Sequence, residues 1–156
     1  AIRDQRGRRL CAGPFCWAPD AGAEAYFAMR RFWIEPAMAS NTAASWAEGI
    51  RSGATPGHVA LQGDVLVGYC FGDRHTGEVV VLALLPEAEG QGLGSDLLGR
   101  VVAQLAGLGW RRLFLGCSTD PASRSHGFYR HLGWRSTGQL DAHGDEILEL
   151  HVPAAG

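Results

Sequence analysis

The pattern of apolar positions changes near residue 57, where short runs typical of strands begin. Residues 58–62 and 65–71 are rich in branched and aromatic side chains, and they flank Gly63-Asp64, a pair that favours a tight turn. We predict a β-hairpin there. Residues 78–85 form a run that is too apolar for a half-exposed strand, so we predict a buried, central strand that Pro86 ends.

Further along the chain, apolar residues recur with helical spacing. The pattern predicts a helix that begins at Ser95, is stopped by Gly109, and buries the face formed by Leu97, Leu98, Val101, Val102, Leu105 and Leu108. A buried strand is predicted over residues 113–117. Asp120-Pro121 has the composition of a helix N-cap with proline in the first turn, and the helix it predicts ends at Gly133. Two more strands are predicted over residues 134–137 and 146–152.

The first 56 residues predict mainly helices. One runs from Asp20 to about Ile34 and a second covers residues 42–51, after a short strand within residues 10–17. Aromatic side chains in this region either pack on the sheet or line a pocket: Trp17, Phe27, Phe32, Trp33 and Trp46. The order of elements predicts one domain over residues 1–156 with a mixed α/β sheet.

Composition and charge exclude several function classes. The 156 residues carry a net charge of -2, so no basic field favours nucleic acid as a partner. All 14 basic side chains are arginine, which excludes a P-loop lysine and pyridoxal chemistry. No apolar run approaches the ~18 residues of a membrane span, so we expect no membrane partner and a cytoplasmic location. His126 and His131 are five residues apart and share no helical face, so we expect no metal site.

A glycine-rich segment, residues 85–95, joins the predicted central strand to the helix. Gly90, Gly92 and Gly94 let the backbone approach a ligand closely, and the helix N-terminus that follows presents free N–H groups. The segment predicts a phosphate site made of backbone alone. A P-loop is excluded because no Lys-Ser/Thr follows, and the dinucleotide pattern G-x-G-x-x-G fails in both registers. An acyl-CoA loop and a plain strand-to-helix turn remain.

Two segments resemble the signatures of the GNAT superfamily of acyl-CoA N-acyltransferases. Glu89-Gly90-Gln91-Gly92-Leu93-Gly94 is similar to its Arg/Gln-x-x-Gly-x-Gly/Ala loop, with Glu89 departing from Arg or Gln. His126 to Trp134 is similar to its F-Y-x-x-L-G-F/W segment, and the resemblance spans roughly residues 58–152. It implies an α+β fold with a mixed, mostly antiparallel central sheet flanked by helices. Residues 1–56 then form the acceptor side, and residues 57–152 form the sheet and the acyl-CoA core.

The resemblance also implies acetyl-CoA as co-substrate and a set of residues that bind it. The backbone of the central strand contributes where it separates from the next strand, and the glycine-rich loop holds the diphosphate. His126 is either a ligand or a solvated helix residue. The implied set is Leu82, Leu84, Leu85, Glu89, Gly90, Gln91, Gly92, Leu93, Gly94, Ser95, His126 and Tyr129.

Two residues are candidates for proton transfer. By resemblance, Tyr129 lies near the coenzyme sulfur, where a phenol can protonate the leaving thiolate; the alternative is an aromatic that only packs, a role we expect Phe128 to fill. Glu78 lies six residues before Leu84, where histone acetyltransferases of the family place a glutamate base. Partial desolvation there raises a carboxyl pKa toward a useful range. The alternatives are a solvated charge and a chain of water molecules.

The implied function is an N-acetyltransferase that transfers the acetyl group of acetyl-CoA to a primary amine of a small molecule or peptide. The amine attacks directly in a ternary complex. A protein N-terminal acetyltransferase and a non-catalytic acyl-CoA-binding module are the alternatives. The resemblance also makes a homodimer plausible.

Overall fold

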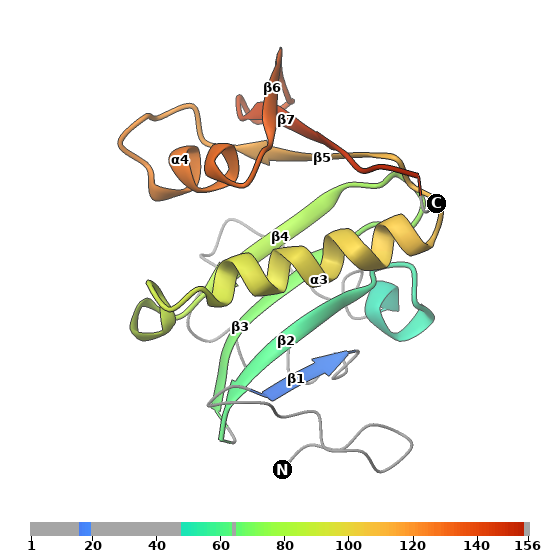
Figure 1. Cartoon of the computed structure of the whole chain (residues 1–156), viewed down its shortest axis with the longest axis vertical. Coiled ribbons are helices and arrows are strands. Elements are labelled where there is room, and N and C mark those ends of the chain that lie inside the picture. Colours follow the sequence, from blue (N-terminus) through green and yellow to red (C-terminus); the bar gives the residue numbers. More distant parts are fainter. Residues whose placement is uncertain (1–15, 20–47, 64, 155–156) are drawn as a thin grey trace.

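The computed structural model describes residues 16–19, 48–63 and 65–154, which form two antiparallel sheets (Figure 1). The first sheet has the order β1 (Cys16–Pro19), β2 (Gly57–Gln62), β3 (Val65–Gly72) and β4 (Val79–Leu84). The second has the order β5 (Arg112–Cys117), β7 (Glu146–His151) and β6 (Arg135–Leu140). The α+β architecture with a mostly antiparallel sheet is therefore confirmed.

The predicted hairpin is confirmed as β2 and β3, which turn at Gly63 with φ 62°. Only glycine adopts this left-handed backbone without strain, so the turn needs it. β4 extends the same sheet by pairing with β3, from Gly68 opposite Leu84 to Gly72 opposite Val79. The hairpin follows directly from the local pattern of apolar residues around a glycine turn.

The prediction that β4 is fully buried is wrong. Among its six residues only Val79 is buried, and Val80 is 38% exposed. β4 is the last strand of the first sheet, because its neighbour β5 meets it only at an isolated parallel bridge between Glu78 and Phe114. The rest of this edge has no described partner strand, and the four residues from Val81 to Leu84 are half-buried.

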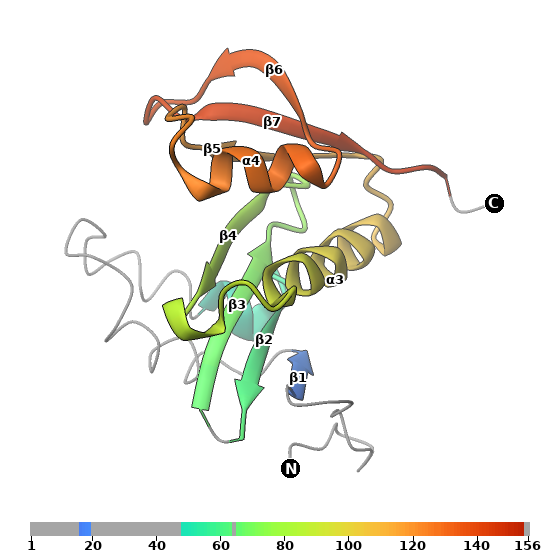
Figure 2. The ribbon, with the colours of Figure 1, turned by 60° about the vertical axis from the view of Figure 1, so that its left-hand side comes forward.

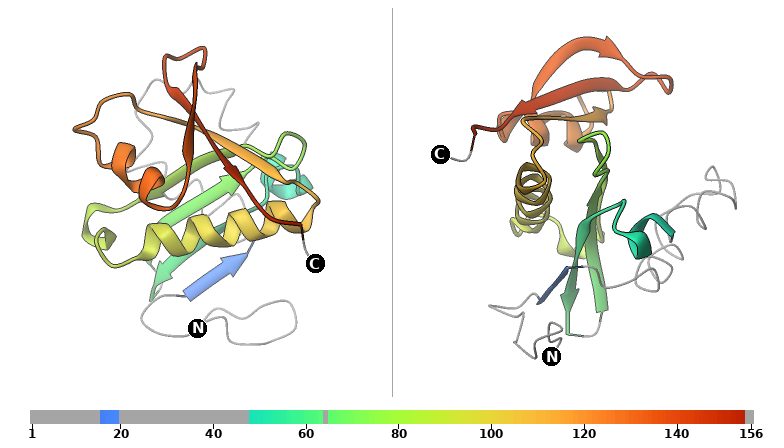
Figure 3. Two further views of the ribbon diagram at one scale, coloured as in Figure 1. Left: turned by 45° about the horizontal axis from the view of Figure 1, so that its top comes forward. Right: turned by 90° about the vertical axis from the view of Figure 1, so that its right-hand side faces the viewer.

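α3 (Leu93–Gly107) lies across the first sheet and contacts β2, β3 and β4 (Figures 1 and 3). The predicted apolar face is confirmed for the four residues that the sheet buries, Leu97, Leu98, Val101 and Leu105. Leu108 is 45% exposed because the helix has ended, and it forms the C-cap. One apolar core reaches both sheets, since α3 packs in the same cluster as Leu113 and Leu148.

α4 (Arg124–His131) lies beside the second sheet, as Figure 2 shows. The prediction that Asp120-Pro121 caps this helix is wrong, because the N-cap is Ser123. The Asp120 carboxylate instead accepts a hydrogen bond from the Ala122 N–H at 2.9 Å, which closes a turn ahead of the helix. The helix predicted over residues 20–34 lies outside the described residues. Of the one predicted over residues 42–51, only its end is described, and residues 48–52 are helical.

Candidate functional site

The two sheets separate beyond a single point of contact. The Phe114 N–H donates to the Gly77 carbonyl at 3.3 Å, next to the bridge between Glu78 and Phe114. Past this point the described residues form no further bridge between β4 and β5, and the strands diverge (Figure 2). Buried backbone groups are almost always paired, so an open strand edge beside an apolar core is a feature that a ligand can complete.

A cavity of about 360 Å³ lies where β4, the glycine-rich loop and α4 meet. Most of its wall is apolar, which suits a ligand with a long uncharged arm. Nine of the residues that the sequence assigned to coenzyme binding line it, and three lining residues were not assigned. The wall consists of Leu82, Leu84, Glu89, Gly90, Gly92, Leu93, Gly94, Ser95, Arg124, Ser125, Phe128 and Tyr129.

The glycine-rich loop is shaped as an anion cradle. Gly90 and Gly92 have φ of 75° and 79°, and a Cβ built on either would meet no atom within 4 Å. This left-handed backbone favours glycine at both positions, and no other part of the described chain crowds them. The first intrahelical hydrogen bond of α3 runs from the Asp96 N–H to the Gly92 carbonyl, so the three amides before Asp96 precede the helical ladder. Together with the helix dipole, they fit a diphosphate.

Tyr129 lines the cavity from α4 while its ring is anchored in the core. The residue is 9% exposed, and its ring packs edge-on against Phe128 at 5.2 Å and Trp134 at 6.2 Å between centroids. Burial is the main cause that raises the pKa of the Tyr129 phenol, and the nearby thiols of Cys70 and Cys117 raise it further. The hydroxyl therefore keeps its proton at neutral pH.

The expectation that Phe128, rather than Tyr129, fills the core is wrong, because Tyr129 is the more deeply buried of the two. Phe128 is only partly buried and forms part of the cavity wall, whereas Tyr129 belongs to the buried cluster. Adjacent helical residues point about 100° apart, so the two rings differ in burial. Both aromatics nevertheless line the cavity.

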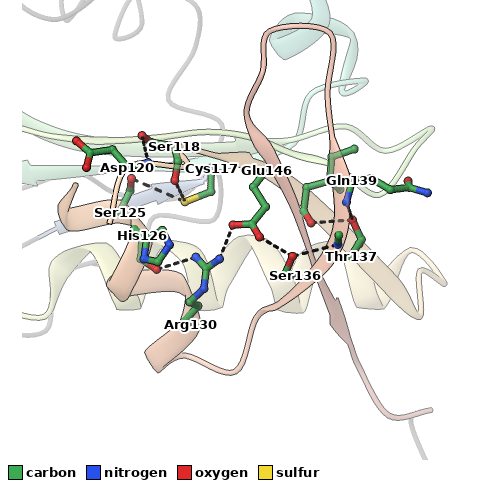
Figure 4. A network of polar contacts seen from close by, with 12 residues as sticks. Cys117, Ser118, Asp120, Ser125, His126, Arg130, Ser136, Thr137, Gln139 and Glu146 are labelled. Atoms are coloured by element: carbon green, nitrogen blue, oxygen red, sulfur yellow. Dashed lines mark hydrogen bonds and ion pairs between the residues drawn. The ribbon is translucent and has the colours of Figure 1, made fainter. Parts of the chain in front are cut away.

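A polar network fixes the helix that carries Tyr129 (Figure 4). The Arg130 guanidinium pairs with the Glu146 carboxylate on β7 and donates to the His126 carbonyl at 3.0 Å. The Ser136 hydroxyl on β6 donates to the same carboxylate at 2.5 Å. The hydrogen bond from Ser136 to Glu146, followed by the one from Arg130, is the main cause that holds the pKa of Glu146 below its ordinary value. α4 is thereby tied to both β6 and β7.

Glu78 lies outside the cavity wall, at the bridge where β4 and β5 still touch. Partial burial raises the pKa of its carboxyl, and the neighbouring carboxylates of Asp73 and Asp141 raise it further. A carboxyl shifted in this direction takes up a proton more readily at neutral pH than an ordinary glutamate. Its position nevertheless separates it from Tyr129 and the loop.

Three other residues assigned from the sequence do not line the cavity. The Leu85 N–H donates to the Val67 carbonyl at 2.8 Å, and its own carbonyl accepts from Ala88 at 2.9 Å, so both backbone groups are occupied. Ala88 closes the short 3-10 helix η1 (Pro86–Ala88). Gln91 is exposed and donates to the Glu87 carbonyl at 3.1 Å. The carbonyl of His126 serves the Arg130 network described above.

Arg124 and Ser125 are the polar lining residues that sequence reasoning missed. Arg124 is the first residue of α4, and its guanidinium forms an ion pair with Glu89 of the loop, 35 residues earlier. Ser125 shares a hydrogen bond with Ser123 at 2.8 Å and faces the Cys117 thiol at 3.8 Å. No local sequence pattern marks either contact, because both depend on how α4 meets the loop.

The described residues show neither a metal-binding cluster nor a membrane-spanning helix. They contain no group of three histidine, cysteine or carboxylate side chains placed to hold a metal ion. None of the helices in the described part of the chain has the length and apolar character to cross a membrane.

The chain matches one protein-family model, and several solved structures share its fold. The model of the acetyltransferase (GNAT) family matches residues 22–134. Ard1 from Thermoplasma volcanium has a similar structure, with a TM-score of 0.71 and 15% identity over 90% of this chain and 99% of that one. The ribosomal-protein-S18-alanine N-acetyltransferase from Escherichia coli gives a TM-score of 0.69 and 18% identity over 91% and 96% of the two chains.

A third similar structure was solved with a ligand. YncA from Salmonella typhimurium, in complex with acetyl-CoA, gives a TM-score of 0.63 and 20% identity over 91% of this chain and 98% of that one. At these identities the structures establish a shared fold. No curated protein matches the sequence significantly.

Proposed function

The chain belongs to the GNAT acetyltransferase family and is an acetyl-CoA-dependent N-acyltransferase, and on this premise we propose that its acceptor is a primary amine of a small molecule or peptide. The observation that carries the proposal is the cavity itself, in which the glycine cradle and the Tyr129 phenol share one wall. A phosphate site and a proton donor in one cavity suit transfer of the acetyl group carried by the coenzyme.

We propose that the loop holds the diphosphate and that the open edge of β4 holds the pantetheine arm. Gly90 and Gly92 line the cavity with a left-handed backbone that other residues rarely adopt, which supports the first assignment. The unbridged stretch of β4 at Leu82 and Leu84, which both line the cavity, supports the second. Backbone N–H groups there can also bond the acetyl oxygen as it gains negative charge.

Tyr129 and Glu78 divide the proton transfers in this proposal. Acetyl-CoA supplies the thioester, whose C–S bond breaks as the amine nitrogen bonds to the acetyl carbon. The Tyr129 phenol passes its proton to the departing sulfur, so coenzyme A leaves as a thiol and the phenolate regains a proton from solvent. Burial raises the pKa of the phenol, which keeps it protonated before the transfer. Glu78 takes the proton that the amine must lose, through an intervening water molecule, because it lies outside the cavity wall.

The charges around Glu78 favour an amine over a neutral alcohol as acceptor. Asp73 and Asp141 lie close enough to raise the pKa of the Glu78 carboxyl, so negative charge is concentrated around Glu78. A primary amine is protonated and positively charged at neutral pH, so it is drawn to such a region before it transfers its proton.

Release of free thiol from acetyl-CoA, measured over a panel of small primary amines and peptides with free N-termini, tests the proposal. We expect thiol release with at least one amine, and intersecting lines when both substrates are varied, as direct transfer requires. If peptides alone are accepted, a protein N-terminal acetyltransferase replaces the small-molecule assignment. Coenzyme binding without thiol release over the whole panel would contradict the proposal and favour a binding module.

A further inference from the structure

The wall of the cavity carries a negative charge that disfavours binding of the coenzyme diphosphate. Glu89 lines the cavity next to Gly90, at the edge of the anion cradle. A carboxylate in this place repels the two negative charges of a diphosphate. The repulsion must be offset if the cradle is to work, and backbone amides alone provide only partial positive charges.

Arg124 lines the same cavity from the first turn of α4, opposite the glycine-rich loop. Its guanidinium pairs with the Glu89 carboxylate, and among the described residues that line the cavity it is the one with a positive charge. The Arg124 side chain is 78% exposed and that of Glu89 is 33% exposed. An ion pair as exposed as this contributes little to fold stability, so stability does not explain its position.

We propose that Arg124 is the side-chain ligand of the coenzyme diphosphate and that Glu89 is its positioning residue. This inference rests on the use of acetyl-CoA by the chain. A guanidinium has five N–H donors in a planar fork, so it can bond the Glu89 carboxylate with one edge and a phosphate with another. Glu89 then directs a flexible side chain toward the cradle, and Arg124 neutralises the charge that would repel the ligand.

Binding measured by calorimetry tests Arg124 with three ligands: coenzyme A, 3′-dephospho-coenzyme A and pantetheine. Arg124→Gln should weaken binding of the first two by roughly tenfold, the scale of one charge-assisted hydrogen bond near the surface. Pantetheine has no diphosphate, so its affinity should not change. Arg124→Lys keeps the charge and loses the fork, so we expect an intermediate affinity.

Arg112→Gln is the matched control, because Arg112 forms a similar exposed pair with Glu149 at 2.6 Å and does not line the cavity. It should bind coenzyme A like the parent protein. Both arginine variants should melt at the temperature of the parent when no ligand is present. Unchanged coenzyme binding by Arg124→Gln, or an equal loss with pantetheine, would overturn the inference.

The role of Glu89 is tested by combining substitutions. Glu89→Gln alone should weaken coenzyme binding slightly, since the ion pair that orients the Arg124 side chain is lost. In the Arg124→Gln background the same change should strengthen binding, because an unpaired carboxylate no longer faces the phosphates. Effects that simply add would overturn the positioning role. A loss confined to coenzyme A and absent with 3′-dephospho-coenzyme A would overturn the diphosphate assignment. If the parent protein binds no coenzyme at all, the assignment of acetyl-CoA fails instead, and this inference fails with it.

Discussion

Replacing Tyr129 with phenylalanine removes one oxygen atom from the cavity wall and changes little else. The ring keeps its contacts with Phe128 and Trp134, at 5.2 Å and 6.2 Å between centroids. No described residue forms a hydrogen bond with the hydroxyl, so its removal leaves no buried partner unsatisfied. We therefore expect the free energy of unfolding to change by about 1 kcal/mol or less.

The effect on turnover should be far larger. If the hydroxyl donates to the departing sulfur, its loss should lower kcat by roughly 10² to 10⁴, the scale of one general acid. This factor corresponds to about 2.7–5.4 kcal/mol in the activation barrier. Because burial raises the pKa of Tyr129, the hydroxyl stays protonated throughout the neutral range, and the loss should not vary with pH there.

The assay is thiol release with an accepted amine, together with coenzyme affinity and melting temperature for Tyr129→Phe. Affinity should stay close to that of the parent protein, since the diphosphate cradle belongs to a different segment. Normal kcat with normal affinity would refute the acid role and leave Tyr129 as a packing residue. Lost affinity with retained kcat would identify it as a coenzyme ligand instead.

Two further predictions concern the loop and the base. Gly92→Glu should abolish the rise in melting temperature that coenzyme A causes, because the new side chain fills the open cradle and repels phosphate; Gly99→Glu, on the same helix and facing open space, should keep it. Glu78→Gln should lower kcat by roughly 10², the scale of one general base. It should also remove the fall in rate at acidic pH, because the parent protein loses its base as the pH drops through the raised pKa of Glu78. The same variant should melt higher than the parent at neutral pH, a difference that disappears below the pKa of an unfolded glutamate, because ionisation of Glu78 disfavours the folded state. Equal melting temperatures at neutral pH would contradict that shift.

Features set by neighbouring residues in the chain were predictable. The β2–β3 hairpin follows from two apolar runs around Gly63, and α3 follows from helical spacing. The glycine-rich loop and Tyr129 line one cavity, and each could be assigned from the sequence because it belongs to a short segment with a recognisable pattern. In these cases the information lies within about fifteen residues, and tertiary contacts agree with it.

Features set by distant segments were not predictable. β4 is the last strand of its sheet because β5 diverges from it, and nothing in the composition of β4 records the path of β5. Asp120-Pro121 has the chemistry of a helix cap, yet its carboxylate closes a turn and the helix begins at Arg124. The pairing of that arginine with Glu89 joins α4 to the glycine-rich loop, two segments of unrelated sequence, so no periodicity could predict it.

The divergence of β4 and β5 interrupts the hydrogen-bond ladder but leaves the apolar core intact. Leu97 of α3 and Leu148 of β7 belong to one buried cluster, so the two sheets are held together on either side of the opening. Among the described residues, packing in this shared core therefore fixes how far apart β4 and β5 lie. A ligand that enters a gap fixed by packing orders few side chains and loses little conformational entropy on the protein side. Diffusion and orientation of the coenzyme, rather than rearrangement of these elements, should then limit its association rate.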